Sequence, residues 1–351
     1  MRAHFAIPGD LAALTGGYGY DREIIARVPA YGMEIEHLAL PQGFPAPSPD
    51  DLRETGRLLC ALAPDDLLLI DGLAFGAFTP DLLAVLPRRT VALVHHPLAL
   101  ETGLLPHDAH ALAASERMAL AHAAHVIVTS PTTGDALVAD YGVGAARITV
   151  AVPGVAQARR ARGSGGGLHI LAVGSVTPRK GHDVLVTALA GLAALDWRLT
   201  IVGSLERAPE HAQALARQIA TQGLSSRIVL AGEVEDAGLE ALYESADIFV
   251  MPSLYEGYGM VLGEAMARGL PIVTTTGGAA AQTVPDGAAL KVGPGDPVAL
   301  TDALARLISD SAMRSSLSQA AFAAGQALPS WDDTARIVAG VLARVAEGTG
   351  A

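Results

Sequence analysis

The stretch Asp247–Ile272 reads DIFVMPSLYEGYGMVLGEAMARGLPI. It begins with the apolar run Ile248–Met251, breaks at a proline, passes through a Gly-rich turn and becomes helical from about Met260, and a second apolar run follows. This succession of strand, loop, helix and strand is the repeating unit of a parallel α/β sheet. Ligands of such sheets bind beyond the carboxyl ends of the strands. We therefore expect a ligand beside Leu254–Met260.

Similar apolar runs recur along the whole chain, with helical patterns between them. Alternation of this kind predicts parallel sheets that are covered by helices on both faces. The expected strands are Ala3–Pro8, Ile35–Leu40, Leu67–Asp71, Thr90–His95, Val126–Thr129 and Ile148–Val152, then Ile170–Val173, Leu199–Val202, Ile228–Leu230, Ile248–Met251, Pro271–Thr274 and Ala289–Val292.

A change of composition separates the two series of strands. The segment RRARGSGGG, at 159–167, has the Gly and Ser content of a flexible linker. We therefore expect a first domain over 1–160 and a second over 161–328, with a ligand site in the cleft between them. The chain reads as helical after about Asp296, with an interruption at Pro329.

Composition excludes several classes of protein. The chain has 351 residues, half of them apolar, and a net charge of −12 with no basic cluster, which argues against nucleic acid as a partner. The lone cysteine, Cys60, cannot form a disulfide framework, and its Leu-rich context predicts a core position. No apolar run has the length of a signal peptide or a transmembrane helix. We expect a cytoplasmic protein in which peripheral membrane contact is not indicated.

The loop at 254–260 carries two carboxylates and two glycines. Gly257 and Gly259 free the backbone for close approach to a ligand, and a helix start offers unpaired amides, here those of Tyr258, Gly259 and Met260. Glu256 would accept hydrogen bonds from sugar hydroxyls. Glu264 lies early in the following helix, where it is suited to bind both hydroxyls of a ribose or simply to cap its own helix.

Two segments of the first domain are also candidates for binding a ligand. Thr15–Asp21, TGGYGYD, precedes a helix that we expect to start near Tyr20, and its glycines either hold a phosphate or sugar oxygen or form a plain tight turn. His95 and His96 end the fourth strand, where an imidazole either donates a hydrogen bond to a sugar or carbonyl oxygen or is satisfied by local backbone.

Two basic residues of the second domain lie after the end of another predicted strand. Arg179 and Lys180 follow an apolar strand and a proline, so they are candidates for binding phosphate oxygens, with a pair of solvated charges as the alternative. The histidines at 107, 110, 122 and 125 match no recognised metal motif, and there is no Asp-x-Asp pair. We therefore expect no metal and no cofactor.

The segment PSLYEGYGMVLGEAMARGLPIV resembles the E-x7-E signature of the retaining glycosyltransferases of group 1, family 4. The resemblance implies the GT-B fold, in which two Rossmann-like, doubly wound parallel-sheet domains face each other across a cleft. In that fold the first domain takes the acceptor and the second the nucleotide sugar. It also implies that the helix within 329–351 crosses back to the first domain.

The resemblance also implies roles for single residues. Gly16 and Gly17 match a Gly-Gly loop that faces the donor, and His95, with His96 as the alternative, matches a histidine close to the transferred sugar. Arg179 and Lys180 match an Arg-Lys pair at the diphosphate, Glu264 the ribose ligand, and the backbone around Val234 the segment that holds the base. The chain departs from the family at Ala279, Ala280, Ala281 and Gln282, where many members carry a Glu, so donor contacts there are in doubt.

Together these features predict a retaining, metal-independent glycosyltransferase. It would move a sugar from a UDP- or GDP-sugar to an unidentified acceptor, which is a glycan, a small molecule or a lipid. His95, Glu256, Arg179 and Lys180 are the expected catalytic residues. Two alternatives are an epimerase or hydrolase of the same fold and a non-catalytic subunit that binds a nucleotide sugar.

Overall fold

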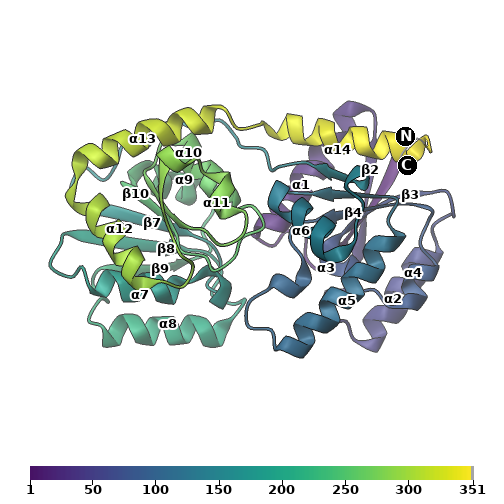
Figure 1. Cartoon of the computed structure of the whole chain (residues 1–351), viewed down its shortest axis with the longest axis horizontal. Coiled ribbons are helices and arrows are strands. Elements are labelled where there is room, and N and C mark those ends of the chain that lie inside the picture. The colour runs from purple at the N-terminus through teal and green to yellow at the C-terminus, as the bar shows by residue number, and fades with distance from the viewer. Residues whose placement is uncertain (349–351) are drawn as a thin grey trace. The chain divides into compact units, whose positions relative to one another are not determined.

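The computed structural model describes residues 1–348 and divides into two compact units (Figure 1). Unit 1 comprises Met1–Gly154 together with the C-terminal segment that starts at Pro329, and unit 2 comprises Val155–Leu328. The last three residues of the predicted segment 329–351 lie outside the described residues.

Unit 1 is built on a parallel sheet of six strands in the order β2-β1-β3-β4-β5-β6. Its central strands are apolar on both faces, and every residue of β3 and β5 is buried, as a parallel sheet covered on both sides requires. The strands are β1 (Arg2–Pro8), β2 (Glu34–Leu40), β3 (Leu67–Asp71), β4 (Arg89–Val94), β5 (His125–Val128) and β6 (Ile148–Val150).

Helices cover both faces of this sheet. Leucine, phenylalanine and alanine side chains from α2 to α6 form one hydrophobic core, and α1, α14 and η1 pack on the other face. The helices are α1 (Gly16–Arg27), α2 (Pro49–Cys60), α3 (Gly72–Phe75), α4 (Pro80–Ala84), α5 (Pro106–His122), α6 (Pro131–Tyr141) and α14 (Trp331–Ala346), with 3-10 turns η1 (Val28–Tyr31), η2 (Leu98–Leu100) and η3 (Ala145–Arg147).

The last helix belongs to unit 1, although it is far from the other elements in sequence. Its buried face includes Val338 and Leu342, the Trp331 ring lies edge-on to Tyr20 with centroids 5.7 Å apart, and the Thr334 hydroxyl donates to the Val152 carbonyl at 2.8 Å. A capping box starts the helix. The Ser330 hydroxyl accepts from the Asp333 amide, and the Asp333 carboxylate accepts from the Ser330 amide.

Unit 2 repeats the plan. Its six-stranded parallel sheet has the order β12-β11-β10-β7-β8-β9. The strands are β7 (Leu168–Val173), β8 (Trp197–Val202), β9 (Ile228–Gly232), β10 (Ile248–Met251), β11 (Ile272–Thr275) and β12 (Ala289–Val292).

Two hydrophobic cores flank the unit 2 sheet. Residues of α7, α8 and α12 form one of them, and residues of α9, α10, α11 and α13 form the other. The elements are η4 (Pro178–Lys180), α7 (His182–Ala190), α8 (Pro209–Thr221), α9 (Asp236–Ser245), α10 (Met260–Ala267), α11 (Ala280–Thr283), η5 (Asp286–Ala288), α12 (Pro297–Ser309) and α13 (Ser311–Gln326).

Each sheet has one point where the direction of winding reverses. In unit 1 the chain moves outward from β1 to β2 and then returns to the other side of β1 with β3; in unit 2 it moves from β7 outward to β9 and returns beside β7 with β10. Loops that leave adjacent strands at such a point diverge to opposite faces and open a crevice at the carboxyl ends. The crevices therefore lie after β1 and β3 and after β7 and β10.

All of the predicted strands are present, and the prediction of two doubly wound, Rossmann-like parallel sheets is confirmed. Two local predictions were wrong. Helix α1 begins at Gly16 rather than near Tyr20, because Thr15 caps it by accepting from the Tyr18 amide. Cys60 is exposed rather than in the core, because it ends the amphipathic helix α2, whose neighbouring Leu59 takes the buried position.

The segment 159–167, predicted as a flexible linker, is fastened to unit 2, and the units divide before it, after Gly154. Backbone amides of Ala161 and Arg162 donate to carbonyls of Arg268 and Glu244, and the Ser164 amide donates to the Asp247 carboxylate. Gly and Ser allow flexibility but do not impose it, and here partners from α9 and from the ends of α9 and α10 hold the segment.

Two glycines of unit 2 allow a test of close packing at the reversal point. Gly181 has φ +64° and a Cβ there would lie 2.3 Å from the Pro252 carbonyl oxygen, whereas Gly223 has φ +70° with nothing near its Cβ position. We expect Gly223→Ala to lower the free energy of unfolding by about 1 kcal/mol through backbone strain alone, and Gly181→Ala by about 3 kcal/mol or more because the clash adds to the strain.

Urea unfolding would measure both effects. The chain has two tryptophans, Trp197 in unit 2 and Trp331 in unit 1, so a Trp331→Phe background reports on unit 2 by fluorescence. Equal losses for the two variants would show that the loops after β7 and β10 do not depend on their close approach.

Candidate functional site

The crevice of unit 2 is formed by the loops after β7 and β10. The Leu254 amide donates to the Arg179 carbonyl at 2.7 Å, so the two loops are joined by backbone. This contact needs glycine at 181, where a side chain would meet the Pro252 carbonyl. The junction brings Arg179 and Lys180, from the first loop, beside Glu256, from the second.

These three side chains form a partly buried charge cluster. Lys180 Nζ lies 2.6 Å from Glu256 Oε1, Arg179 Nη1 lies 3.5 Å from Glu256 Oε2, and the Glu256 side chain is only 7% exposed. Burial would raise the pKa of Glu256, but the charges of Lys180 and Arg179 outweigh it and lower that pKa to about 2. Glu256 is therefore ionised at neutral pH, and the cluster carries a net positive charge.

The loop after β11 supports the backbone of Glu256. The Glu256 amide donates to the Gly277 carbonyl at 3.2 Å, and its carbonyl accepts from the Ala279 amide at 2.8 Å. A side chain on Gly277 or Gly278 would lie within 2.3 Å of the 254–256 backbone. Ala279 and Ala280 are buried at the start of α11. This loop therefore braces the Glu256 backbone.

Glu264 has a partner that the sequence did not indicate. The Tyr243 hydroxyl donates to Glu264 Oε2 at 2.8 Å, the Tyr243 ring stacks on Phe249, and the guanidinium of Arg268 lies over the same ring at 4.4 Å. Burial raises the pKa of Glu264 above its ordinary value. Tyr243 thus fixes one carboxylate oxygen of Glu264.

The amino end of α10 begins at an N-cap glycine in the left-handed conformation. Gly259 has φ +85°, and a Cβ there would press on Leu262 and Met251. Met260 is the first residue of the helix, so its amide has no intrahelical acceptor. The Tyr258 carbonyl accepts from the Thr283 hydroxyl at 2.7 Å, which holds the turn. Val234 follows β9 and packs at the margin of the hydrophobic core formed by α9 and α10.

The crevice of unit 1 contains His95 and two buried carboxylates. His95 Nε2 lies 3.3 Å from Asp21 Oδ1 and 3.9 Å from Asp71 Oδ2. Gly16 and Gly17 form the first turn of α1, and the Cβ position of Gly17 lies 3.5 Å from the His95 ring. The Gly-Gly segment, which follows β1, therefore packs against His95, which follows β4, although β3 lies between these two strands.

His96 lies apart from this cluster. Its Nε2 is 3.6 Å from Glu101 Oε2, and 23% of its side chain is exposed. Of the two histidines, His95 faces the crevice where the winding reverses. Whether either meets a sugar stays a prediction.

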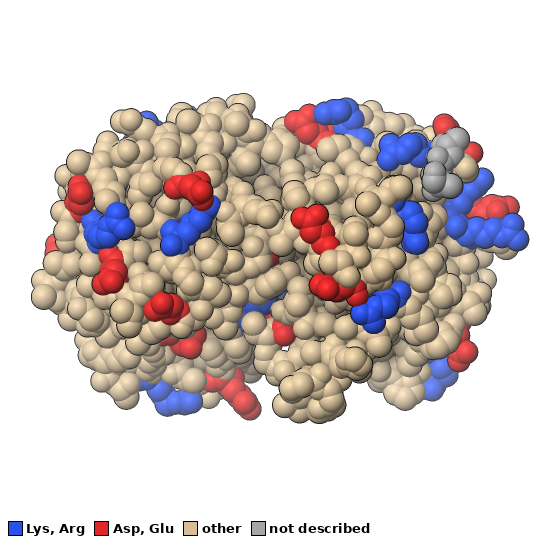
Figure 2. Space-filling view, in the orientation of Figure 1, with Lys and Arg blue, Asp and Glu red and all other residues tan. Residues whose placement is uncertain are grey.

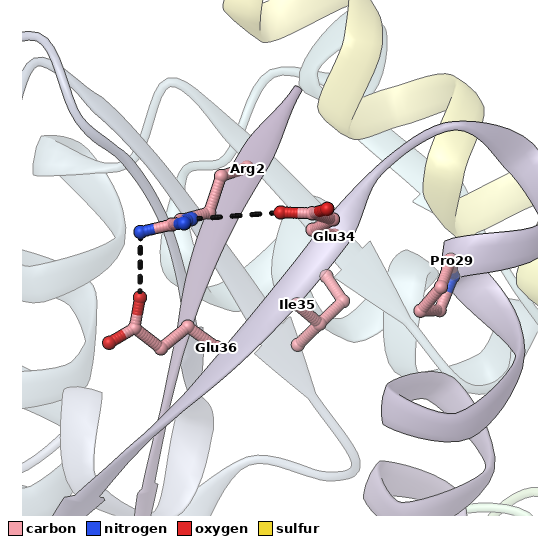
Figure 3. Close-up of a pocket in the computed structure, with 5 residues that line it drawn as sticks. All are labelled: Arg2, Pro29, Glu34, Ile35 and Glu36. Carbon is pink, nitrogen blue, oxygen red and sulfur yellow. Dashed lines mark hydrogen bonds and ion pairs between the residues drawn. The ribbon is translucent and has the colours of Figure 1, made fainter.

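A surface pocket of about 360 Å³ lies elsewhere in unit 1, at the amino ends of β1 and β2 (Figure 3). Arg2 points between two carboxylates, 3.8 Å from Glu34 and 3.4 Å from Glu36, and all three side chains are more than half exposed. Ligands of parallel sheets bind at the opposite ends of the strands. We therefore assign this pocket no part in the reaction.

The histidines at 107, 110, 122 and 125 do not converge. His107 pairs with Asp108, His122 contacts a carbonyl of its own helix, and His125 contacts Thr149. Within residues 1–348, the one group of three potential ligands is Asp21, Asp71 and His95, whose atoms lie within 4.8 Å of one another.

The charged surface is sparse and mixed. In Figure 2 the acidic and basic side chains stand in small groups of both signs, and the face shown has no broad basic area. No helix within residues 1–348 combines the length and the apolar character that crossing a bilayer requires.

Comparison with known families identifies the group of proteins. The model for glycosyl transferases group 1 matches residues 167–310, and the model for Glycosyltransferase Family 4 matches residues 25–159. The chain belongs to the glycosyltransferases of group 1, family 4. The resemblance inferred from the E-x7-E segment is therefore confirmed.

Individual relatives are identical to the chain at about a third of the aligned positions. It is 31% identical to the D-inositol 3-phosphate glycosyltransferase of Paenarthrobacter aurescens over 68% of the chain and 62% of that protein, and 32% identical to that of Xylanimonas cellulosilytica over 73% and 67%. It is 32% identical to mannosylfructose-phosphate synthase of Agrobacterium fabrum over 44% of the chain and 38% of that protein. The first and last of these alignments span less than two thirds of the relative.

Solved structures share the fold. Sucrose-phosphate synthase from Thermosynechococcus elongatus superposes with a TM-score of 0.79 and 22% identity, covering 95% of this chain and 96% of that one. Anabaena HepE in complex with UDP and glucose gives a TM-score of 0.75 and 18% identity over 98% and 99%. The predicted GT-B fold class is confirmed.

The charge cluster of unit 2 predicts a particular pattern of stability. Removing one member of a buried ion pair leaves the charge of the other buried and without a partner. Lys180→Met and Glu256→Gln should therefore each lower the free energy of unfolding of unit 2 at pH 7 by about 2–4 kcal/mol. The double variant should lose less stability than the sum of the two single losses, and the difference should be about 1 kcal/mol or more.

Urea unfolding in the Trp331→Phe background would measure these changes. Because the pKa of Glu256 is lowered from 4.5 to about 2, the stability from its ionised form is complete above pH 4.5 and is lost as pH falls toward 2. The loss in Lys180→Met should therefore shrink between pH 5 and pH 3. A constant loss, or strict additivity, would contradict the pairing.

Proposed function

We propose that the protein is a retaining, metal-independent glycosyltransferase that moves a sugar from a nucleotide diphosphate sugar to an acceptor hydroxyl. The single observation that carries the proposal is the cluster of Arg179, Lys180 and Glu256 at the point of unit 2 where the sheet winding reverses. Membership in the family supports the reaction class, and retention rests on the family resemblance alone.

The cluster suits a leaving diphosphate. In the transfer, the bond between the anomeric carbon and the diphosphate breaks with its electron pair going to the diphosphate. The acceptor oxygen bonds to that carbon, and its proton passes to an oxygen of the leaving diphosphate. Arg179 can fork onto phosphate oxygens and Lys180 adds a compact charge, so both stabilise the developing anion without a metal. When they turn to the diphosphate, Glu256 becomes available to accept from a sugar hydroxyl.

The remaining unit 2 residues would hold the nucleotide. Glu264, fixed on one side by Tyr243, would accept from ribose hydroxyls through its other oxygen. The amides at the start of α10, from Tyr258 to Met260, would face the phosphates, and the backbone at Val234 would contact the base. HepE, which shares the fold, is described in complex with UDP and glucose, so UDP is the first nucleotide to test.

Unit 1 would take the acceptor. Gly16 and Gly17 would instead face the donor, and His95, with His96 as the alternative, would lie close to the transferred sugar. The relatives include enzymes named for D-inositol 3-phosphate, which makes a phosphorylated polyol the first acceptor class to test.

Nucleotide binding tests the donor site without knowledge of the acceptor. By calorimetry we expect one of UDP, GDP and ADP to bind selectively, with no change on adding EDTA. Lys180→Ala should weaken this binding at least tenfold, about 1.4 kcal/mol, because a charge-assisted hydrogen bond to phosphate is lost. Arg217→Ala, at an exposed position of α8, is the matched control and should bind as the wild type does.

The outcomes separate the parts of the proposal. If none of the three nucleotides binds to folded protein, the donor site is wrong. Binding that EDTA abolishes would remove metal independence but leave the nucleotide site.

Glu256→Gln should separate chemistry from binding. The neutral amide no longer neutralises Lys180 and Arg179, so UDP should bind as well or more tightly. Transfer from UDP-glucose or a related donor to D-inositol 3-phosphate or another active acceptor, followed by mass spectrometry, should fall about 100-fold or more. Unchanged turnover in this variant would show that Glu256 has no part in the transfer.

A further inference from the structure

We propose that Glu116 is a positioning residue for the loop 95–101, which follows β4 and carries His95 and His96. It holds this loop through a buried hydrogen bond from the Leu98 amide. The hydrogen bond stands on the geometry of unit 1 alone. Its consequence for sugar transfer rests on the proposed function, in which one of the two histidines lies close to the transferred sugar.

Glu116 is an acid among apolar side chains. It lies in α5, only 1% of it is exposed, and it shares the buried face of that helix with Ala119 and Leu120, which belong to the hydrophobic core of unit 1. Burying an acid costs its hydration, whereas an apolar side chain would be buried favourably at the same place. The acid is therefore expected to have a partner that an apolar side chain could not satisfy.

The partner of Glu116 is the backbone of the loop 95–101. The Leu98 amide donates to Glu116 Oε2 at 3.0 Å. Leu98 is the first residue of the 3-10 turn η2, so its amide has no acceptor within that turn. Glu116 supplies the missing acceptor from a different element.

Close packing supports this contact. Gly76 ends α3, and a Cβ at that position would lie 2.8 Å from Leu98 Cδ1 and 3.2 Å from Glu116 Cγ. A larger residue at 76 would therefore push the loop and the acid apart. Residues that follow β3 and β4 thus meet Glu116 at one point of α5.

The loop is fastened on both sides of His96. The Thr129 hydroxyl, directly after β5, donates to the His95 carbonyl at 3.1 Å. The Leu98 amide is held by α5, and between these two points lie only His96 and Pro97, whose ring restricts its own φ. Releasing Leu98 would free one end of this short stretch and allow both histidines to move.

The contact uses Glu116 as a hydrogen-bond acceptor. The neighbouring basic residue, Arg117, turns away, because its Nε and Nη2 donate to the Asp140 carbonyl at 3.2 and 2.6 Å. Burial raises the pKa of Glu116 to about 8, although the Leu98 amide and the Tyr141 hydroxyl act in the opposite direction. We therefore expect an uncharged acceptor of the same length to serve as well.

Three substitutions separate the reach of the side chain from its acidity. Glu116→Gln keeps a carbonyl oxygen at the same reach and removes the acid. Glu116→Asp keeps the acid and withdraws it by the length of one methylene, and Glu116→Met removes both. Glu116→Gln is thus the matched control for the other two.

Hydrogen exchange of the full chain, followed by mass spectrometry, measures the anchoring directly. We expect the amides of 98–101 to exchange about tenfold faster or more in the Asp and Met variants, because the Leu98 amide loses its acceptor. Exchange in Glu116→Gln should match the wild type. Peptides from β3 and β5 should keep their protection in all three variants, which shows that only the loop is released.

Unchanged exchange at 98–101 in the Asp and Met variants would overturn the proposal, as would fast exchange in Glu116→Gln. If Glu116→Met does not fold, the Asp and Gln variants still have opposite expected results. This measurement needs neither nucleotide nor acceptor, so it is independent of the proposed transferase activity.

Transfer by the same variants tests the positioning role. The kcat should fall about tenfold or more in Glu116→Asp and Glu116→Met and stay within about twofold in Glu116→Gln, because the histidines are misplaced only in the first two. UDP affinity, which we assign to unit 2, should be unchanged in all three.

A merely structural role for Glu116 would lower the yield of folded protein and leave the kcat of the folded enzyme as in the wild type. That result would overturn the positioning role. Absence of transfer in the wild type would instead contradict the proposed function, while the hydrogen-exchange result would still decide whether Glu116 holds the loop.

Discussion

Both units depend on the same constraint, which is that a parallel sheet wound to both sides must reverse direction once. At that point two loops leave neighbouring strands on opposite faces, and no backbone fills the space between them. Polar and charged side chains can converge there while the strands behind them stay apolar on both faces. In unit 1 this place holds His95, Asp21 and Asp71. In unit 2 it holds Arg179, Lys180 and Glu256.

The two clusters solve the problem of burying charge differently. In unit 2, the charges of Lys180 and Arg179 outweigh the burial of Glu256 and lower its pKa to about 2, so this carboxylate stays ionised at neutral pH. In unit 1, two carboxylates lie beside one imidazole, and burial followed by the charge of Asp21 raises the pKa of Asp71 to about 7, so the charge of Asp71 changes near neutrality. Salt and phosphate analogues should act mainly on the first cluster, and pH mainly on the second.

Most of the fold was readable from the sequence because strands buried on both faces appear as short apolar runs. The members of the unit 2 charge cluster were readable for the same reason, since Arg179, Lys180 and Glu256 lie in the loops that follow such runs. Asp71 ends the run LLLID and so carried the same signal as His95, but its meeting with Asp21 depends on strand order, which apolar runs do not reveal. The contact between Tyr243 and Glu264 could not be predicted from the sequence, because Tyr243 lies in α9 and reaches Glu264 only through tertiary packing. The start of α1 was missed because glycine disfavours helices, and the Thr15 cap overrides that preference.

The return of α14 to unit 1 makes the order of synthesis matter. Unit 2 is one continuous segment, Val155–Leu328, and all of it has been made before α14 exists. Unit 1 is interrupted, and one face of its sheet is covered in part by Val338, Leu342 and neighbouring residues, which leave the ribosome after all of unit 2. The first unit to be translated is therefore the last that can be completed. Until then its nascent sheet presents an apolar face that a chaperone could recognise.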